Sequence, residues 1–150
     1  MPRSPSELRD QLSTIESDDA TYEGLGRDDV AALTPLLEDD EGWLAARAVH
    51  ALGRIDDPLA HEAILAAASM PRLEVRVAAA TEAGRLPAEL ADGVLMGLLG
   101  DPEPAVRKFA VRSVSPRNGV AVRSRVQELA DAEPNPRIKD MAEEKSRSTR

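Results

Sequence analysis

Apolar residues recur along this chain in two patterns that share one interval. The first is a triplet with the i, i+3, i+4 spacing of one helix face, as in Leu33, Leu36 and Leu37. The triplet returns as Ile64, Ala67 and Ala68, as Leu95, Leu98 and Leu99, and as Val126, Leu129 and Ala130. Each copy predicts the first, amphipathic helix of a pair.

The second pattern places apolar residues at i, i+4, i+8 and i+11, as in Leu44, Ala48, Leu52 and Ile55. Such a stripe is wide enough to pack on neighbours from two sides, and it predicts the second helix of each pair. The segment 44–48 is matched at 75–79, 106–110 and 138–142, at steps of 31, 31 and 32 residues. Two patterns with one period predict a repeat of helix pairs.

Turn residues fall between the expected helices. Asp56-Asp57-Pro58, Leu86-Pro87 and Ser115 to Gly119 separate repeats, and Met70-Pro71 and Asp101 to Pro104 separate the helices of one pair. We expect Asp28 or Asp29 to cap the first helix and Pro35 to kink it. The expected repeats cover residues 28–58, 59–88, 89–119 and 120–147, which form one repeat domain over 28–147.

The chain begins with a helix signal that lies outside the repeats. Ser4-Pro5-Ser6-Glu7 is a capping box with proline in the first turn, and Leu8, Leu12 and Ile15 share one face. We expect a capping helix over residues 5–17 within a cap and linker of residues 1–27; a partly disordered arm is the alternative. Residues 148–150 are expected to form a flexible tail.

Composition supports a helical fold. The chain has 24 Ala and 17 Leu among 150 residues, but one Trp, one Tyr and one Phe, whereas β-sandwich cores use aromatic and β-branched residues. The lack of Cys excludes disulfides and thiolate metal sites. No apolar run approaches the roughly 18 residues of a membrane span, and the start has no signal-peptide pattern. We therefore expect a cytoplasmic protein.

Two segments resemble the HEAT-like repeat, and above all the short version found in phycobilisome lyases. They are Leu98 to Ala110, which contains Asp101 and Arg107, and Ala51 to Pro58. The resemblance covers residues 28–147 and implies an all-α, right-handed α-solenoid of about four helix pairs with an N-terminal capping helix. It says little about function.

The same resemblance implies a ladder between repeats, built from an Asp in the turn within a pair and an Arg six residues later. Asp101 with Arg107 has this spacing, and Glu133 with Lys139 is a softened copy. The first two repeats have only half of the pair each, so Asp39 is expected to reach Arg76 across repeats.

Sequence motifs for catalysis are missing. The chain has two histidines, His50 and His61, and no Gly-rich phosphate loop or serine nucleophile motif. These observations predict a protein that is not an enzyme and has no metal site or cofactor.

Charge changes sign along the sequence. Residues 1–43 carry a net −9, residues 44–103 a net −4 and residues 104–150 a net +5, within a total of −8. The basic residues of 107–125 suggest nucleic-acid binding as an alternative. The acidic balance of the whole chain disfavours it, because phosphate binders present a net basic face.

The second helices of HEAT-like repeats line the concave surface, so their outward positions are the expected partner site. Those positions are Trp43, Arg47, His50, Arg54, Thr81, Arg85, Phe109, Arg112 and Met141. Trp and Arg are enriched among the dominant residues of protein interfaces, whereas the alternative packs Trp43 and Phe109 inside the fold. The leading hypothesis is a monomeric, non-catalytic scaffold for a protein partner; a further alternative is an accessory factor resembling the phycobilisome lyases.

Overall fold

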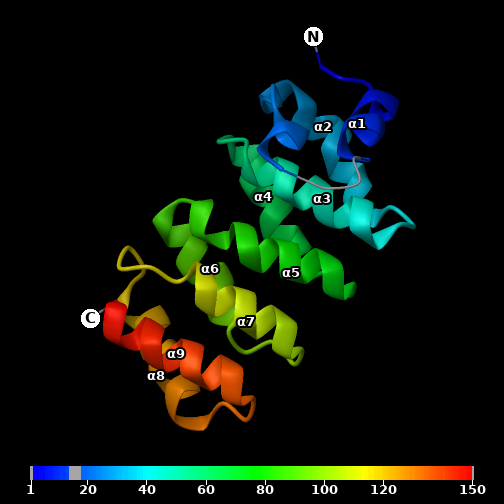
Figure 1. The fold of residues 1–150 in the computed structure, drawn as a ribbon. Helices are drawn as coiled ribbons and strands as arrows, with labels where there is room; N and C mark the ends of the chain where they lie inside the picture. Colours follow the sequence, from blue (N-terminus) through cyan, green and yellow to red (C-terminus); the bar gives the residue numbers. More distant parts are fainter. Residues whose placement is uncertain (1, 14–17, 150) are drawn as a thin grey trace. The chain divides into compact units, whose positions relative to one another are not determined.

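The computed structural model describes residues 2–13 and 18–149, and every regular element in these ranges is helical (Figure 1). The α-helices are α1 (Pro5–Leu12), α2 (Val30–Leu33), α3 (Gly42–Gly53), α4 (Pro58–Ala67), α5 (Leu73–Glu82), α6 (Ala88–Leu98), α7 (Pro104–Ser113), α8 (Val120–Ala132) and α9 (Pro136–Ser148). Short 3-10 helices join them: η1 (Asp19–Tyr22), η2 (Arg27–Asp29), η3 (Thr34–Glu38) and η4 (Ala83–Arg85). None of these helices is both long and apolar enough to cross a membrane.

The apolar period of the sequence reappears as buried residues of successive helices. Leu44 in α3, Val75 in α5, Val106 in α7 and Ile138 in α9 are all at most 3% exposed. The first-helix triplets lie in α2 with η3, in α4, in α6 and in α8, and the last residues of the second and third triplets, Ala68 and Leu99, are the C-caps of α4 and α6. Small Ala side chains at many positions of these helices are buried too, so the helices pack closely without aromatic filler.

The chain divides into two compact units, Met1–Ala79 and Ala80–Arg150, with the boundary inside α5. In the N-terminal unit, α1 packs on α2 and α3 through Leu8 and Leu12, both fully buried. Ser4 caps α1 by accepting a hydrogen bond from the Glu7 backbone N–H at 3.1 Å. The helix expected over residues 5–17 ends at Leu12; residues 14–17, and with them Ile15, lie outside the described residues.

Asp29 occupies the N-cap position of α2, as the sequence suggested, but its side chain accepts no hydrogen bond from a backbone N–H of that helix. Its carboxylate accepts hydrogen bonds from the backbone N–H groups of Arg3 and Gly26, at 2.9 and 3.0 Å, and from the Arg3 guanidinium at 2.9 Å. Burial alone would raise the pKa of Asp29, but these hydrogen bonds and the Arg3 charge lower it below its usual range. Asp29 therefore fastens the start of the chain to the beginning of the first repeat.

Pro35 interrupts the first helix of the first repeat. The α-helical turns of α2 stop at Leu33, and the chain continues as the 3-10 helix η3, with Pro35 in its first turn. Proline has no N–H to donate and its ring crowds the preceding turn, which explains why the expected kink is a change of helix type.

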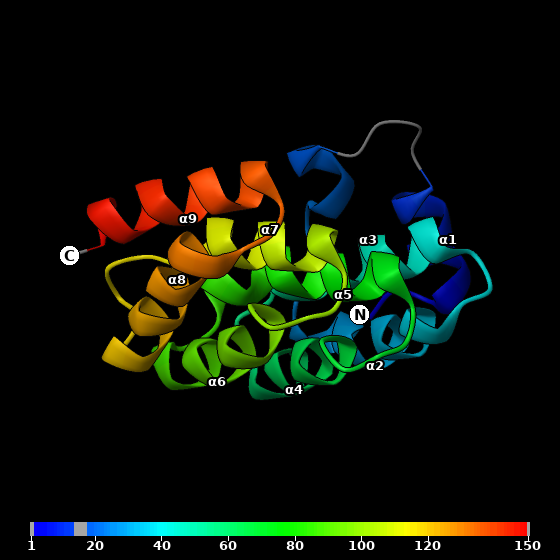
Figure 2. The same ribbon diagram turned by 90° about the horizontal axis from the view of Figure 1, so that it is seen from below.

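In the C-terminal unit, α8 and α9 pack along each other, and α7 packs on α9 while α6 packs on α8. The fully buried Leu95, Leu99, Val106 and Val126 form the middle of this core. Figure 2 shows the same helices from a second direction.

Candidate functional site

The outward face of α3 carries an exposed aromatic residue. Trp43 is 45% exposed, and the guanidinium carbon of Arg47 lies 5.2 Å from the centroid of its ring. Arg47 is held from the other side, because its Nη1 donates a 2.6 Å hydrogen bond to the Leu12 carbonyl at the end of α1. The structure thus brings Trp43 and Arg47 together at the surface, as the spacing on the predicted stripe requires.

Two further residues of the stripe, His50 in α3 and Arg54 directly after α3, are in contact with Tyr22 of η1. The Tyr22 and His50 rings meet edge to face with centroids 6.5 Å apart, and the Arg54 guanidinium carbon lies 4.9 Å from the Tyr22 centroid. Tyr22 is 7% exposed. Sequence reasoning missed Tyr22; the signal that could have found it is the Asp18–Thr21 capping box, which folds η1.

The C-terminal unit has its own aromatic and cationic cluster on α7. The half-buried Phe109 has Lys108 Nζ at 5.3 Å and the Arg112 guanidinium carbon at 5.5 Å from its ring centroid. Beside it, between α7 and α9, is a pocket of about 330 Å³. Its lining comprises Val111, Arg112, Met141, Glu144, Lys145 and Ser148. The structure therefore places Arg112 and Met141, two residues of the predicted stripe, in one pocket.

Lys145 fixes the position of this pocket. Its Nζ donates to the carbonyls of Arg112 and Val114, at 3.1 and 2.8 Å, and so joins α9 to the end of α7. Burial lowers the pKa of Lys145 below its ordinary value. The stripe residues Thr81 and Arg85 do not line this pocket; Arg85 is paired with Glu82 at 3.4 Å.

In the structure, Arg107 forms its ion pair with Glu133 of the next turn. Arg107 donates from Nε and Nη2 to the two carboxylate oxygens of Glu133, at 2.9 and 2.8 Å, and from Nη1 to the Asp101 carbonyl at 2.9 Å. The Arg107 hydrogen bonds hold the pKa of Glu133 below its usual range. Arg107 thus bridges two successive inter-helix turns.

On the N-terminal side, Asp39 forms an ion pair with Arg9 of α1 at 2.6 Å. Arg76 donates to the carbonyls of Met70 and Pro71, at 3.1 and 2.8 Å. The Asp39–Arg76 pair and the role of Lys139 stay predictions.

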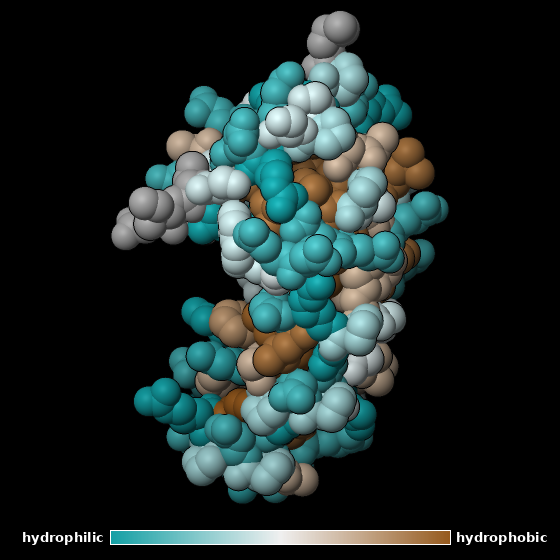
Figure 3. Space-filling model, turned by 90° about the vertical axis from the view of Figure 1, so that its right-hand side faces the viewer, coloured by the Kyte–Doolittle hydropathy of each residue, from teal (hydrophilic) through white to brown (hydrophobic). Residues whose placement is uncertain are grey.

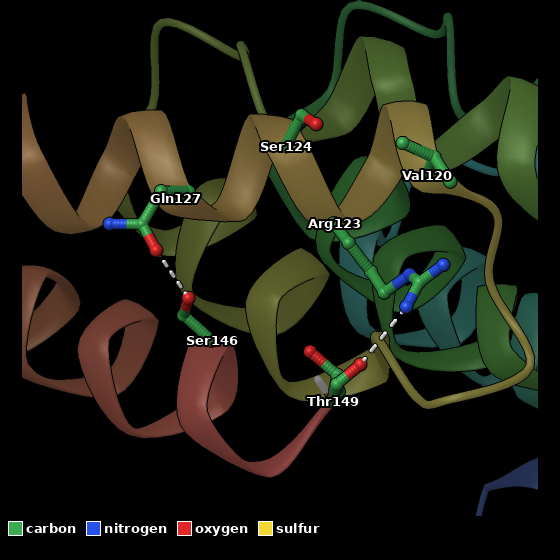
Figure 4. A pocket seen from close by; sticks show the side chains of 6 residues that line it. All are labelled: Val120, Arg123, Ser124, Gln127, Ser146 and Thr149. Atoms are coloured by element: carbon green, nitrogen blue, oxygen red, sulfur yellow. Dashed lines mark hydrogen bonds between the residues drawn. The ribbon is translucent and has the colours of Figure 1, made fainter.

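Several basic residues suggested for nucleic-acid binding make contacts within the protein. Arg117 donates to the Gly84 and Leu86 carbonyls, and Arg125 pairs with Glu128 at 2.9 Å. Arg123 donates to the Thr149 carbonyl at 3.3 Å, next to a pocket of about 320 Å³ between α8 and α9 (Figure 4). The ion pair with Glu128 offsets the charge of Arg125, and the hydrogen bonds of Arg117 and Arg123 occupy donors that a phosphate would otherwise use.

The two histidines contact different residues. His61 Nε2 lies 3.3 Å from an Asp56 carboxylate oxygen, and His50 contacts Tyr22. Among the residues that the structure describes, no three His, Asp or Glu side chains lie close enough to hold a metal ion.

Apolar surface is divided into small areas. On the face drawn in Figure 3, apolar residues reach the surface in separate patches with polar residues between them. The exposed large apolar side chains of the described residues are Trp43, Leu59, Leu73, Met96 and Val120. A partner that binds such a surface must combine apolar contact with polar or charged groups.

Comparison with known proteins finds a likeness of fold. No protein-family model and no curated protein matches the chain. A solved structure, the complex of CpcE and CpcF of phycocyanin lyase from Nostoc sp. PCC7120, is similar with a TM-score of 0.73 and 17% sequence identity. The match covers 93% of this chain and 98% of that chain. The all-α, HEAT-like repeat fold is thereby confirmed.

The expectation that the chain is not an enzyme is wrong. The similar structure is named as part of a phycocyanin lyase, which is an enzyme, so a fold of this kind does serve catalysis. The expectation rested on missing motifs, and missing motifs exclude only the chemistries that need them.

Proposed function

We propose that this chain is an accessory factor of the lyase type that binds a partner protein and acts on it or assembles with it. The observation that carries the proposal is the α7–α9 surface, where Lys108 and Arg112 contact the Phe109 ring and Arg112 also lines the pocket that contains Met141. The solved structure that the chain resembles is itself a complex of two subunits, which supports a protein as the partner.

The residue types of this surface suit a protein interface. Aromatic residues, Met and Arg are enriched in protein interfaces, since they combine a large apolar area with a polar or polarisable group. Lys108 and Arg112 beside the Phe109 ring favour a partner segment with carboxylates next to an apolar residue, because the cations stay at the rim while the ring is covered.

The α3 surface offers a second contact area with the same chemistry. Trp43 is exposed, and Arg47 lies over its ring. As on α7, the exposed ring can contact an apolar group of the partner, and the neighbouring arginine can contact an acidic group beside it.

The proposal is tested by comparing what the wild-type chain and its variants retain from cells that make this protein. Partners are crosslinked to the protein and quantified by mass spectrometry. We expect the double variant Phe109→Ala, Arg112→Ala to retain about tenfold less of the partner than the wild type, because it has lost one or two interface anchors. Trp43→Ala should lower the recovery too.

The matched controls remove exposed apolar side chains elsewhere. Val120 on α8 is 69% exposed and Leu59 on α4 is 63% exposed, and both lie outside the proposed surfaces. Val120→Ala and Leu59→Ala should recover the partner as the wild type does. A partner set that is equal for all five proteins would rule out the proposed surfaces.

A further inference from the structure

Residues 18–24, here called the Tyr22 segment, are held against α3 by contacts from the start of the chain. Gln11 of α1 donates from Nε2 to the carbonyls of Thr21 and Glu23, at 3.0 and 3.1 Å. Arg3 Nη1 donates to the Gly24 carbonyl at 3.0 Å. All three bonds are accepted by backbone carbonyls of the segment.

The segment contacts α3 and the residue that follows it through the ring of Tyr22. Tyr22 has the His50 ring at its edge and the Arg54 guanidinium over its face, and it is almost completely buried. Edge-to-face pairs and a cation over a ring are the two favourable geometries for an aromatic side chain at a surface. Acidic residues Asp18, Asp19 and Glu23 surround Tyr22 in the sequence.

We propose that the surface formed by His50 and Arg54 at the end of α3 is a docking site for an aromatic residue of an acidic partner segment, and that the Tyr22 segment fills this site in the free chain. The proposal rests on the proposed function and names the chemistry of the partner. The Tyr22 segment indicates that chemistry, because its own tyrosine contacts both the His50 ring and the Arg54 guanidinium.

The Tyr22 segment is built to be displaced. Its only regular structure is the four-residue η1, and Ala20, Glu23 and Gly24 are exposed. Gly24, the last residue of the segment, adopts φ +76°, a left-handed conformation that glycine takes up readily. Release of the segment therefore uncovers the α3 site without disturbing a long helix.

A partner can also gain a contact that the Tyr22 segment does not make. Trp43 and Arg47 lie on the same α3 stripe, and Trp43 stays 45% exposed while Tyr22 is docked. A partner segment that reaches from the His50–Arg54 site to Trp43 would compete against the Tyr22 segment with additional buried aromatic area.

The test uses a fluorescein-labelled peptide with the sequence of residues 18–24, added to the full chain and followed by fluorescence anisotropy. Tyr22→Ala empties the site, so it should bind the peptide about tenfold more tightly than the wild type does, since self-occupancy reduces the competent fraction. Tyr22→Phe keeps the ring and should behave as the wild type. Arg54→Ala in the Tyr22→Ala background should weaken peptide binding about tenfold.

A second variant keeps the experiment decisive if Tyr22→Ala does not fold. Gln11→Ala removes the two bonds to the Thr21 and Glu23 carbonyls and leaves α3 unchanged, so it should raise peptide affinity in the same direction. A peptide in which alanine replaces the tyrosine should not bind either variant.

Equal peptide affinity for wild type and both variants, no saturable binding up to about 1 mM peptide, or binding that does not depend on Arg54 would overturn the proposal. These outcomes are separate from failure of the proposed function, which is decided by partner recovery with the Phe109 and Trp43 variants. A chain can pass either test and fail the other.

Discussion

Glu133 shows how one carboxylate is stabilised in a helical repeat. Both its oxygens accept hydrogen bonds from Arg107, and one also accepts the Asn135 backbone N–H at 3.2 Å. The Glu133 side chain is 2% exposed and that of Arg107 13%. A bidentate pair of this kind satisfies charges that would be costly to bury alone.

Removing the Glu133 charge should therefore destabilise the protein. We expect Glu133→Gln to lower the free energy of unfolding by about 2 kcal/mol at pH 7, because it leaves Arg107 with an uncompensated, partly buried charge. Urea unfolding followed by circular dichroism measures the loss. The control is Glu128→Gln, since Glu128 is 65% exposed beside Arg125 and its pair should contribute little.

The same pair predicts a pH dependence. The folded-state pKa of Glu133 is below its ordinary value of 4.5, so its stabilisation is complete above that value and is lost as pH falls through the folded-state pKa. The difference in unfolding free energy between wild type and Glu133→Gln should accordingly shrink below about pH 4.5. A difference that stays constant down to pH 3 would contradict this assignment.

At the scale of single elements, α9 depends on the residue before it. Asn135 accepts hydrogen bonds from the backbone N–H groups of Arg137 and Ile138, at 3.0 and 3.2 Å. These are two of the N–H groups that a helix start leaves without a partner. Since α9 packs on both α7 and α8, its start matters for the core of the C-terminal unit.

Asn135→Ala should lower the free energy of unfolding by about 1 kcal/mol, the usual cost of losing an N-cap. Hydrogen exchange at the Arg137 and Ile138 amides should accelerate. Asn135→Asp keeps a capping oxygen and should stay close to the wild type. If the alanine and aspartate variants are equally stable, the cap does not contribute to stability.

The elements also show how far sequence reasoning reaches. The apolar period located α3 to α9 because each helix buries one face, and burial at helical spacing leaves a mark on the sequence. It could not locate Tyr22 on α3, since that contact joins η1 to a helix some 30 residues away without any shared periodicity. The side chain of Asp29 was expected to cap a helix because its actual partner, Arg3, lies 26 residues earlier.

The candidate sites, too, could be predicted only in part from the sequence. The helical angle placed Trp43, Phe109 and Arg112 at outward positions, and Trp43 is exposed while Arg112 lines a pocket with Met141. The pocket itself depends on how α9 packs along α7. Lys145 contributes to that packing by donating hydrogen bonds to the Arg112 and Val114 carbonyls, and no pattern of residue types predicts a bond to a backbone carbonyl. The helical angle agrees with the exposure of Trp43, whereas Phe109 is half-buried, and the contacts around both residues could not be predicted from the sequence.

At the scale of the whole molecule, charge is shared unequally. Residues 1–79 carry a net −9 and residues 80–150 a net +1. Mutual repulsion among excess like charges destabilises a compact state, and added salt screens it. The N-terminal unit should therefore respond more strongly to salt.

We expect hydrogen exchange of α3 amides to slow several-fold when NaCl is raised from about 0.05 to about 0.5 M, which shortens the Debye length from roughly 14 to 4 Å. Exchange of α8 amides in the same sample should change little, and it serves as the internal control. Equal slowing in α3 and α8 would show that the effect of salt is not electrostatic relief of the N-terminal unit.

The placement of the aromatic residues determines what optical methods can see of this protein. Trp43 and Tyr22, the one tryptophan and the one tyrosine of the chain, both belong to the N-terminal unit, and the C-terminal unit has Phe109 alone. Intrinsic fluorescence and absorbance at 280 nm therefore follow residues 1–79, whereas far-ultraviolet dichroism follows helices of both units. Unfolding curves recorded by the two methods need not coincide, and a mismatch between them would reveal separate melting of the two halves.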